Sequence, residues 1–158
     1  MRLRSLFAVL LPLTFAACLN GTEPVTFPNI PIESTNFAPA LNVNLAASTK
    51  TSTGLYYRDI TVGTGAAVAT GQQATITYVG QLANGATFDQ SNPSNPTFPF
   101  VLGAGQVIPG FDQGVLGMKV GGVRQLIIPP ELGYGAASNG AIPGNSVLVF
   151  SVTLVSIK

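Results

Sequence analysis

Apolar and polar residues alternate along much of the chain from residue 54 onward. The clearest alternation runs through residues 73–82 and 147–157, in which nearly every second residue is apolar. A period of two is typical of a β-strand with one buried face. Shorter apolar and β-branched runs, bounded by Gly, Pro, Asn or Asp, predict further strands at 55–62, 86–88, 98–102 and 121–128.

One segment, residues 109–116, has a helical pattern instead. Pro109 suits the first position of a helix, and Ile108, Phe111 and Val115 fall on one apolar stripe. The glycines in and beside this segment each cost about 1 kcal/mol relative to Ala, so packing must hold the helix. The sequence therefore predicts an α+β fold in which a curved antiparallel sheet of five to six strands wraps around one short α-helix.

The start of the chain has the pattern of a secretion signal. Arg2 and Arg4 make it positive, and an apolar run of 12 residues follows at 6–17. That run is too short for a transmembrane helix, which needs about 20 residues. Residues 1–17 are therefore predicted to be a signal peptide, and the protein is expected to be exported.

The single cysteine, Cys18, comes directly after this segment. Residues 15–18, Phe-Ala-Ala-Cys, resemble the lipobox of bacterial lipoproteins, in which the Cys is diacylated and becomes the mature N-terminus. The resemblance implies a lipoprotein anchored to a membrane of the bacterial cell envelope, on the periplasmic or the outer side. The alternative is ordinary signal cleavage nearby, which would leave a soluble protein with one spare thiol.

Between this cysteine and the alternating region, residues 18–52 are rich in Asn, Thr, Ser, Pro and Ala and keep no apolar period. Such a composition predicts an extended tether. Two alternatives stay open, a linker that is disordered throughout or one with a short ordered piece around 37–46 that docks on the domain. The folded domain is expected to span residues 53–158.

Composition excludes several classes of function. Only 8% of the residues are charged, the formal net charge is +1, and Lys and Arg form no cluster beyond Arg2 and Arg4, which argues against nucleic-acid binding. The chain has no His, so catalytic dyads and triads that need an imidazole are excluded. One Cys allows no intrachain disulfide and no Cys-x-x-Cys site. We expect neither a metal nor a cofactor.

Five short motifs occur in order along the domain. They are residues 76–80 (Ile-Thr-Tyr-Val-Gly), 85–89 (Gly-Ala-Thr-Phe-Asp), 107–111 (Val-Ile-Pro-Gly-Phe), 132–135 (Leu-Gly-Tyr-Gly) and 148–150 (Leu-Val-Phe). Together they resemble the FKBP family, the immunophilins that isomerise X–Pro peptide bonds and bind tacrolimus or rapamycin. The resemblance covers residues 54–158, and it implies a prolyl isomerase that is a monomer and acts on proline-containing polypeptides.

The resemblance also implies where the site lies. Asp89, the hydroxyl of Tyr134 and the backbone N–H of Ile108, which would hold a substrate carbonyl, are its candidate catalytic groups. Apolar walls are expected from Tyr78, Phe88, Phe98, Val107, Phe111, Ile142 and Phe150.

Two residues depart from the family pattern. Phe111 stands where well-studied members carry Trp, and Ser94 stands where an Arg often lies near the Asp. Without that Arg, the charge of Asp89 must be balanced by Tyr78 or by backbone donors.

Other interpretations of the same residues remain. The aromatic side chains could simply fill a β core, and Asp89 could be a hairpin cap. A domain of this kind could bind proline-containing partners without turnover, or serve as the scaffold of a structural lipoprotein.

Overall fold

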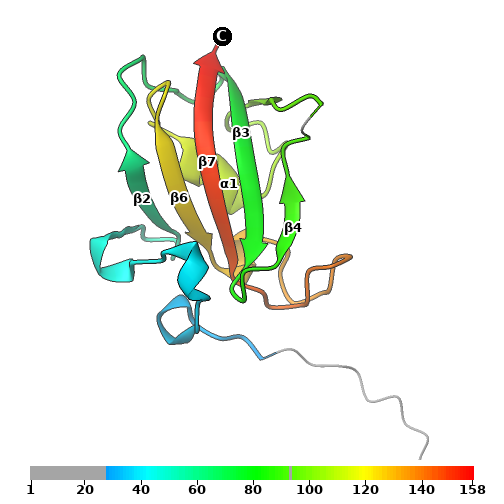
Figure 1. The fold of residues 1–158 in the computed structure, drawn as a ribbon. Coiled ribbons are helices and arrows are strands. Elements are labelled where there is room, and N and C mark those ends of the chain that lie inside the picture. The colour runs from blue at the N-terminus through cyan, green and yellow to red at the C-terminus, as the bar shows by residue number, and fades with distance from the viewer. Residues whose placement is uncertain (1–27, 93) are drawn as a thin grey trace, which may run out of the picture.

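A computed structural model describes residues 28–92 and 94–158 of the chain. They form one antiparallel sheet curved around a single short α-helix (Figure 1). The strand order is β1-β2-β6-β7-β3-β4, and β5 pairs with β3 beside β4. The strands are β1 (Thr49–Lys50), β2 (Tyr56–Thr61), β3 (Gln73–Leu82), β4 (Thr87–Gln90), β5 (Phe98–Val101), β6 (Val123–Ile128) and β7 (Leu148–Ile157). The helices are α1 (Pro109–Val115) and four 3₁₀ turns, Ile32–Ser34, Pro39–Leu41, Leu45–Ala47 and Pro130–Leu132.

The predicted α+β class is confirmed, and the predicted helix and strands all lie within two residues of their expected bounds. The expected number of strands was wrong, because the described residues form a seven-stranded sheet. The additional strand is β1, whose two residues pair with Tyr56 and Tyr57 of β2. Its sequence has no apolar alternation, so this strand exists through its pairing with β2 rather than through a local preference.

The concave face of the sheet packs on α1. Two glycines make this close approach possible. A Cβ at Gly110 would lie 2.4 Å from the side chain of Ile128, and one at Gly114 would lie 2.6 Å from that of Leu126. The glycines that weaken the helix locally are thus the residues that let it reach the sheet. This packing forms the main hydrophobic cluster of the protein, which we call the inner cluster. Its largest fully buried members include Leu55, Ile76, Phe100, Leu102, Met118, Leu126, Ile128, Leu148 and Leu154.

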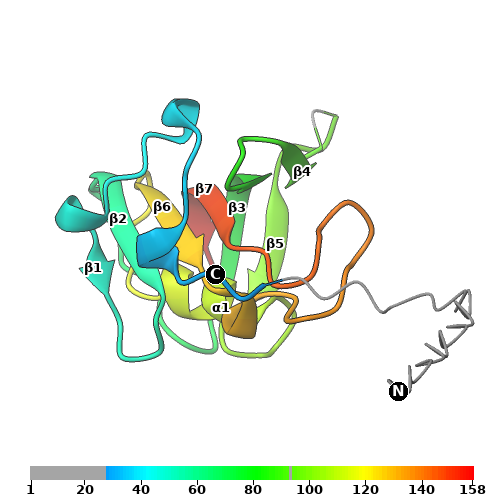
Figure 2. The same cartoon turned by 90° about the horizontal axis from the view of Figure 1, so that it is seen from below.

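A second segment covers the opposite face of the sheet. We call residues 28–48 the N-terminal strap; Figure 2 shows its cyan part on the other side of β6 from α1. Ile32 of the strap packs with Tyr56, Ile127 and Val147, and Phe37, Val43 and Leu45 lie against this group, the outer cluster. The described part of the expected tether is therefore docked, over a longer range than 37–46. The predicted signal peptide and Cys18 lie outside the described residues.

Polar contacts also fasten the strap. The Gln125 side chain donates to the backbone carbonyl of Leu41 at 2.7 Å, and the backbone N–H of Ala38 donates to the carbonyl of Ala83 at 2.8 Å. Across residues 28–92 and 94–158, no helix is long and apolar enough to cross a membrane.

Candidate active site

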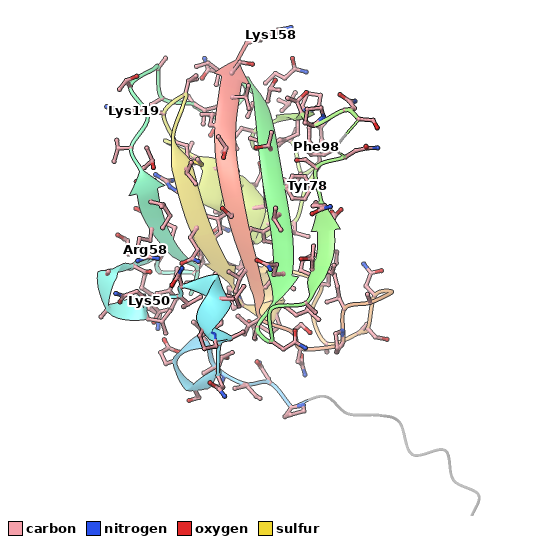
Figure 3. All side chains as sticks on the ribbon, viewed as in Figure 1. Lys50, Arg58, Tyr78, Phe98, Lys119 and Lys158 are labelled. Carbon is pink, nitrogen blue, oxygen red and sulfur yellow. The ribbon has the colours of Figure 1, made fainter. Side chains whose placement is uncertain are left out.

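A cavity of about 490 Å³ opens beside β3, where Figure 3 shows Tyr78 and Phe98 close to each other. Strands β3, β4, β5 and β7, helix α1 and two loops each contribute to it. The lining residues are Tyr78, Asp89, Phe98, Gln106, Val107, Ile108, Phe111, Tyr134 and Phe150. Side chains separated by more than 70 positions in the sequence meet here because β3 and β7 pair along their whole length.

Aromatic rings form the floor of the cavity. Phe111, at the start of α1, is only 4% exposed, and its ring meets those of Phe150, Tyr78 and Phe100 edge to face at 5.2, 5.9 and 5.9 Å. Edge-to-face pairs are a favoured aromatic geometry. Phe98 contacts the ring of Tyr78 at 6.0 Å and is itself 38% exposed. These rings pack into the core on one side and form an apolar surface of the cavity on the other. The aromatic side chains thus both fill the core and line the candidate site.

Asp89 is held at the edge of this floor by two donors. The Tyr78 hydroxyl donates to Oδ2 at 2.8 Å, and the backbone N–H of Gln90 donates to Oδ1 at 2.8 Å. Both donors are of the kinds expected to balance the charge of Asp89, namely Tyr78 or the backbone. Burial, and then the hydrogen bond to Asp89 and its negative charge, raise the pKa of Tyr78 to about 12. Tyr78 therefore stays a donor at any physiological pH.

Two further donors face the cavity. Ile108 lies just before α1, where its carbonyl accepts from Phe111 at 2.9 Å, and within the described chain its own N–H donates to no acceptor. Tyr134 lies in the loop after the turn Pro130–Leu132, where the N–H of Gly135 donates to the Pro130 carbonyl at 2.9 Å. Burial, and the charge of Asp89, raise the pKa of Tyr134 above its ordinary 10.0. Among the described residues its hydroxyl has no hydrogen-bond partner, so this donor is free for a ligand.

The structure does not bring every predicted site residue into the lining. Phe88 is half-buried and packs against the inner cluster, with its ring edge to face with Phe150 at 5.5 Å, in space that the missing side chain of Gly80 leaves open. Ile142 is 6% exposed and belongs to the inner cluster, within a turn closed by two backbone hydrogen bonds with Asn139. Neither side chain is among those that line the cavity.

Sequence reasoning missed one lining residue, Gln106. Its Oε1 accepts from the backbone N–H of Val101 at 2.7 Å, which ties the end of β5 to the loop that carries Val107 and Ile108. Nothing in a run of Gly and Ala residues signals such a contact, although its place directly before the Val-Ile-Pro motif could have suggested it.

Chemically, the cavity offers an apolar floor, one carboxylate and two donors that have no partner in the described part of the chain. Within 28–92 and 94–158, no three His, Cys, Asp or Glu side chains lie together as a metal site. The arrangement can bind an apolar ring and hold the carbonyl groups beside it. It contains no side chain placed as a nucleophile with a base.

Comparison with known proteins agrees with this geometry. The family model of the FKBP-type peptidyl-prolyl cis-trans isomerase matches residues 65–155. FK506-binding protein 3 of Candida albicans is 47% identical over 105 residues, which cover 66% of this chain and 24% of that protein. FK506-binding protein 4 of Rhizopus delemar is 48% identical over 113 residues, or 70% of this chain and 29% of that protein. The chain thus spans about a quarter of the length of the curated relatives it matches.

Two solved structures share the fold. The crystal structure of FkpA from Escherichia coli superposes with a TM-score of 0.65 at 39% identity, covering 71% of this chain and 52% of that one. The crystal structure of AtFKBP13 gives a TM-score of 0.65 at 37% identity, covering 70% of this chain and 98% of that one. With the family match spanning more than half of its residues, the chain belongs to the FKBP-type peptidyl-prolyl cis-trans isomerase family.

Proposed function

We propose that the protein is a peptidyl-prolyl cis–trans isomerase whose substrates are X–Pro bonds of polypeptides. The observation that carries the proposal is the aromatic cavity floored by Phe111. At its walls lie the N–H of Ile108 and the hydroxyl of Tyr134, neither of which has a hydrogen-bond partner among the described residues. A proline ring is a compact apolar group, and the carbonyls on either side of it are acceptors that these donors can reach.

The apolar floor accounts for much of the expected rate gain. Rotation about a peptide bond has a barrier of about 18–20 kcal/mol because planar resonance is lost at the transition state. The twisted amide carries less negative charge on its oxygen than the planar form, and therefore needs less hydration. A cavity walled by Phe98, Phe111 and Phe150 disfavours the planar amide more than the twisted one, which is differential binding of the transition state.

The two hydrogen-bond donors would orient the substrate. A carbonyl held by the N–H of Ile108 or by Tyr134 fixes one side of the X–Pro bond while the other side turns. A ten-thousandfold acceleration requires only about 5.5 kcal/mol of transition-state stabilisation. The mechanism uses no nucleophile and no acid–base pair, which is consistent with a chain that has no His.

The test is a peptide exchange measurement. Magnetisation-transfer NMR on a Leu-Pro peptide should show faster cis–trans exchange in the presence of catalytic amounts of the protein, and the proline-limited phase of a refolding substrate should shorten. Peptide shifts around Tyr134 with no gain in exchange rate would instead indicate a binding module without turnover. An unchanged exchange rate in both assays overturns the enzymatic proposal.

We also propose that tacrolimus-type macrolides occupy this cavity. The relatives named above are FK506-binding proteins, and the pocket residues Tyr78, Asp89 and Ile108 line the same cavity here. The macrolide should compete with the proline peptide. A macrolide that leaves peptide exchange unaffected at saturating concentration would contradict the shared site.

For the cellular role, we propose that the protein assists folding in a bacterial cell envelope, held to the membrane by a diacyl lipid on Cys18. Support comes from the signal-like residues 1–17 and from the Phe-Ala-Ala-Cys sequence at 15–18. Two acyl chains anchor a protein firmly where one is marginal. Mass spectrometry of the mature N-terminus tests this, since an unmodified Cys18 or cleavage elsewhere would rule the anchor out. Cys18→Ser should release the protein from membranes.

A further inference from the structure

The cavity carries one charge. Asp89 is the only acidic or basic side chain among its lining residues, and it is exposed to solvent. Its two hydrogen bonds, from the Tyr78 hydroxyl and the Gln90 N–H, fix the carboxylate at the mouth of an otherwise apolar site. Each carboxylate oxygen has a second acceptor position, so the group can take another donor.

No cation of the described chain neutralises this carboxylate. The ion pairs among residues 28–92 and 94–158 are Lys50 with Glu33 and Arg124 with Asp59. Arg58 is engaged elsewhere, since it donates to the carbonyl of Asn42 at 2.7 Å. The remaining lysines, Lys119 and Lys158, lie toward the end of the sheet where β7 ends (Figure 3).

Aromatic side chains border the same mouth. Phe98 and Tyr134 are 38% and 37% exposed, and both line the cavity with Asp89. The Tyr78 ring, 6.0 Å from that of Phe98, continues this surface. An aromatic face attracts a cation within about 6 Å of its centre, and a carboxylate beside it adds a charge-assisted hydrogen bond. A carboxylate among open rings is thus suited to an ammonium or guanidinium group.

We propose that the site prefers X–Pro bonds with a lysine or arginine adjacent to the proline, whose cationic end group lies between Asp89 and the rings of Phe98 and Tyr134. This inference rests on the proposed isomerase function, and it names the substrate class of that site. The proline ring occupies the floor at Phe111, while the methylene stem of the neighbouring basic side chain runs along the apolar rim. Because Asp89 is exposed, the cation keeps part of its hydration and the preference is modest.

The experiment compares peptides that differ in one charge. Proline peptides carrying Lys, Nε-acetyl-lysine, norleucine or Glu directly before the proline, and a second set with these residues directly after it, are measured by exchange NMR and by shift titration. In whichever of the two sets the lysine lies nearer to Asp89, we expect kcat/KM of the Lys peptide to be about threefold that of the norleucine peptide, as for an exposed ion pair. The Glu peptide of that set should have the lowest kcat/KM. The ratio should fall toward one in high salt.

Asp89→Asn supplies the matched variant, because it removes the charge and keeps an acceptor for Tyr78. It should bring the Lys-to-norleucine ratio close to one, whatever happens to the overall rate. Glu131→Gln is the control, since it removes an equal charge from a residue that does not line the cavity, and its ratio should stay near three.

The outcomes separate the two proposals. Rapid exchange of the norleucine peptide with a Lys-to-norleucine ratio of one, or a ratio that survives Asp89→Asn, overturns the basic preference and leaves the isomerase proposal standing. Absence of turnover for every peptide overturns the isomerase proposal, and the dissociation constants from the shift titrations then decide the preference by the same threefold criterion.

Discussion

The two faces of the sheet are covered by different kinds of structure. On the concave face, α1 packs through Gly110 and Gly114 against β6, and the inner cluster around it stays open at one side, where the cavity lies. On the convex face, the N-terminal strap closes a smaller cluster around Ile127 with short 3₁₀ turns. We therefore expect the inner cluster to serve both stability and substrate binding, and the outer cluster to serve stability.

Replacement of the cavity floor should have the largest effect. Phe111→Ala removes a ring that contacts Phe150, Tyr78 and Phe100, so it should cost about 3–5 kcal/mol of unfolding free energy and nearly all turnover. Urea unfolding and peptide exchange measure the two losses. Phe111→Leu is the control, because it keeps an apolar floor and should cost less than about 1.5 kcal/mol. A fully active Phe111→Ala protein would show that the floor is not the substrate's binding surface.

The corresponding change in the strap should separate stability from activity. Leu41 is 6% exposed, so Leu41→Ala should cost about 2 kcal/mol of unfolding free energy, at the low end for a buried Leu. The folded protein should keep its kcat/KM within twofold, because Leu41 lies on the other side of the sheet from the cavity. Unchanged urea unfolding would mean that the strap is not packed in solution, and a large loss of kcat/KM would mean that the strap also shapes the site.

The same contrast explains what the sequence could predict. Strands β3 and β7 carry ten-residue alternations whose period is visible in one dimension. The strap has no period, and Ile32 is buried only because Ile127 and Val147, some 100 positions away, are apolar on the outer face. Burial of this kind depends on tertiary complementarity, which no local pattern reveals.

The site shows a similar limit. Adjacent residues of a regular strand point to opposite faces, so Phe88 and Asp89 would not be expected on the same side. The pairing of β3 with β4 shifts register between Gly80 and Gln81, which places one additional residue on β4. This irregularity lets Phe88 pack against the inner cluster while Asp89 reaches the cavity. The motif order identified both residues, but the division of their roles required the backbone.

Removal of one hydrogen-bond donor from the cavity, the hydroxyl of Tyr134, should lower activity without disturbing the packing of the inner cluster. Tyr134→Phe deletes a hydroxyl that has no partner in the described structure, so unfolding free energy should stay within about 0.5 kcal/mol. Loss of one hydrogen bond to a substrate carbonyl should lower kcat/KM about tenfold. Because the pKa of Tyr134 is raised above 10.0, the ratio of wild-type kcat/KM to that of Tyr134→Phe should be constant from about pH 6 to 9. If this ratio instead changed with pH within that range, the effect would have to come from another group.

The smallest expected effect concerns the polar clamp that fastens the strap. Glu33 Oε1 accepts from Lys50 Nζ at 2.6 Å and from the Tyr56 hydroxyl at 2.5 Å. These two hydrogen bonds, the one from Lys50 foremost, lower the pKa of Glu33 from its ordinary 4.5 to about 2. A carboxylate whose pKa is lower in the folded state stabilises the protein fully above its unfolded pKa. That stabilisation is lost as the pH falls from about 4.5 toward 2.

Glu33→Gln isolates this contribution from that of the other carboxylates, since it keeps an acceptor without the titration. Wild-type unfolding free energy should exceed that of Glu33→Gln above about pH 5, and the two should converge as the pH approaches 2. The clamp is exposed, so the difference should be small and should shrink in high salt. Urea unfolding at a series of pH values measures it. A difference that stays constant from pH 7 to 2 would show that the carboxylate charge does not hold the strap.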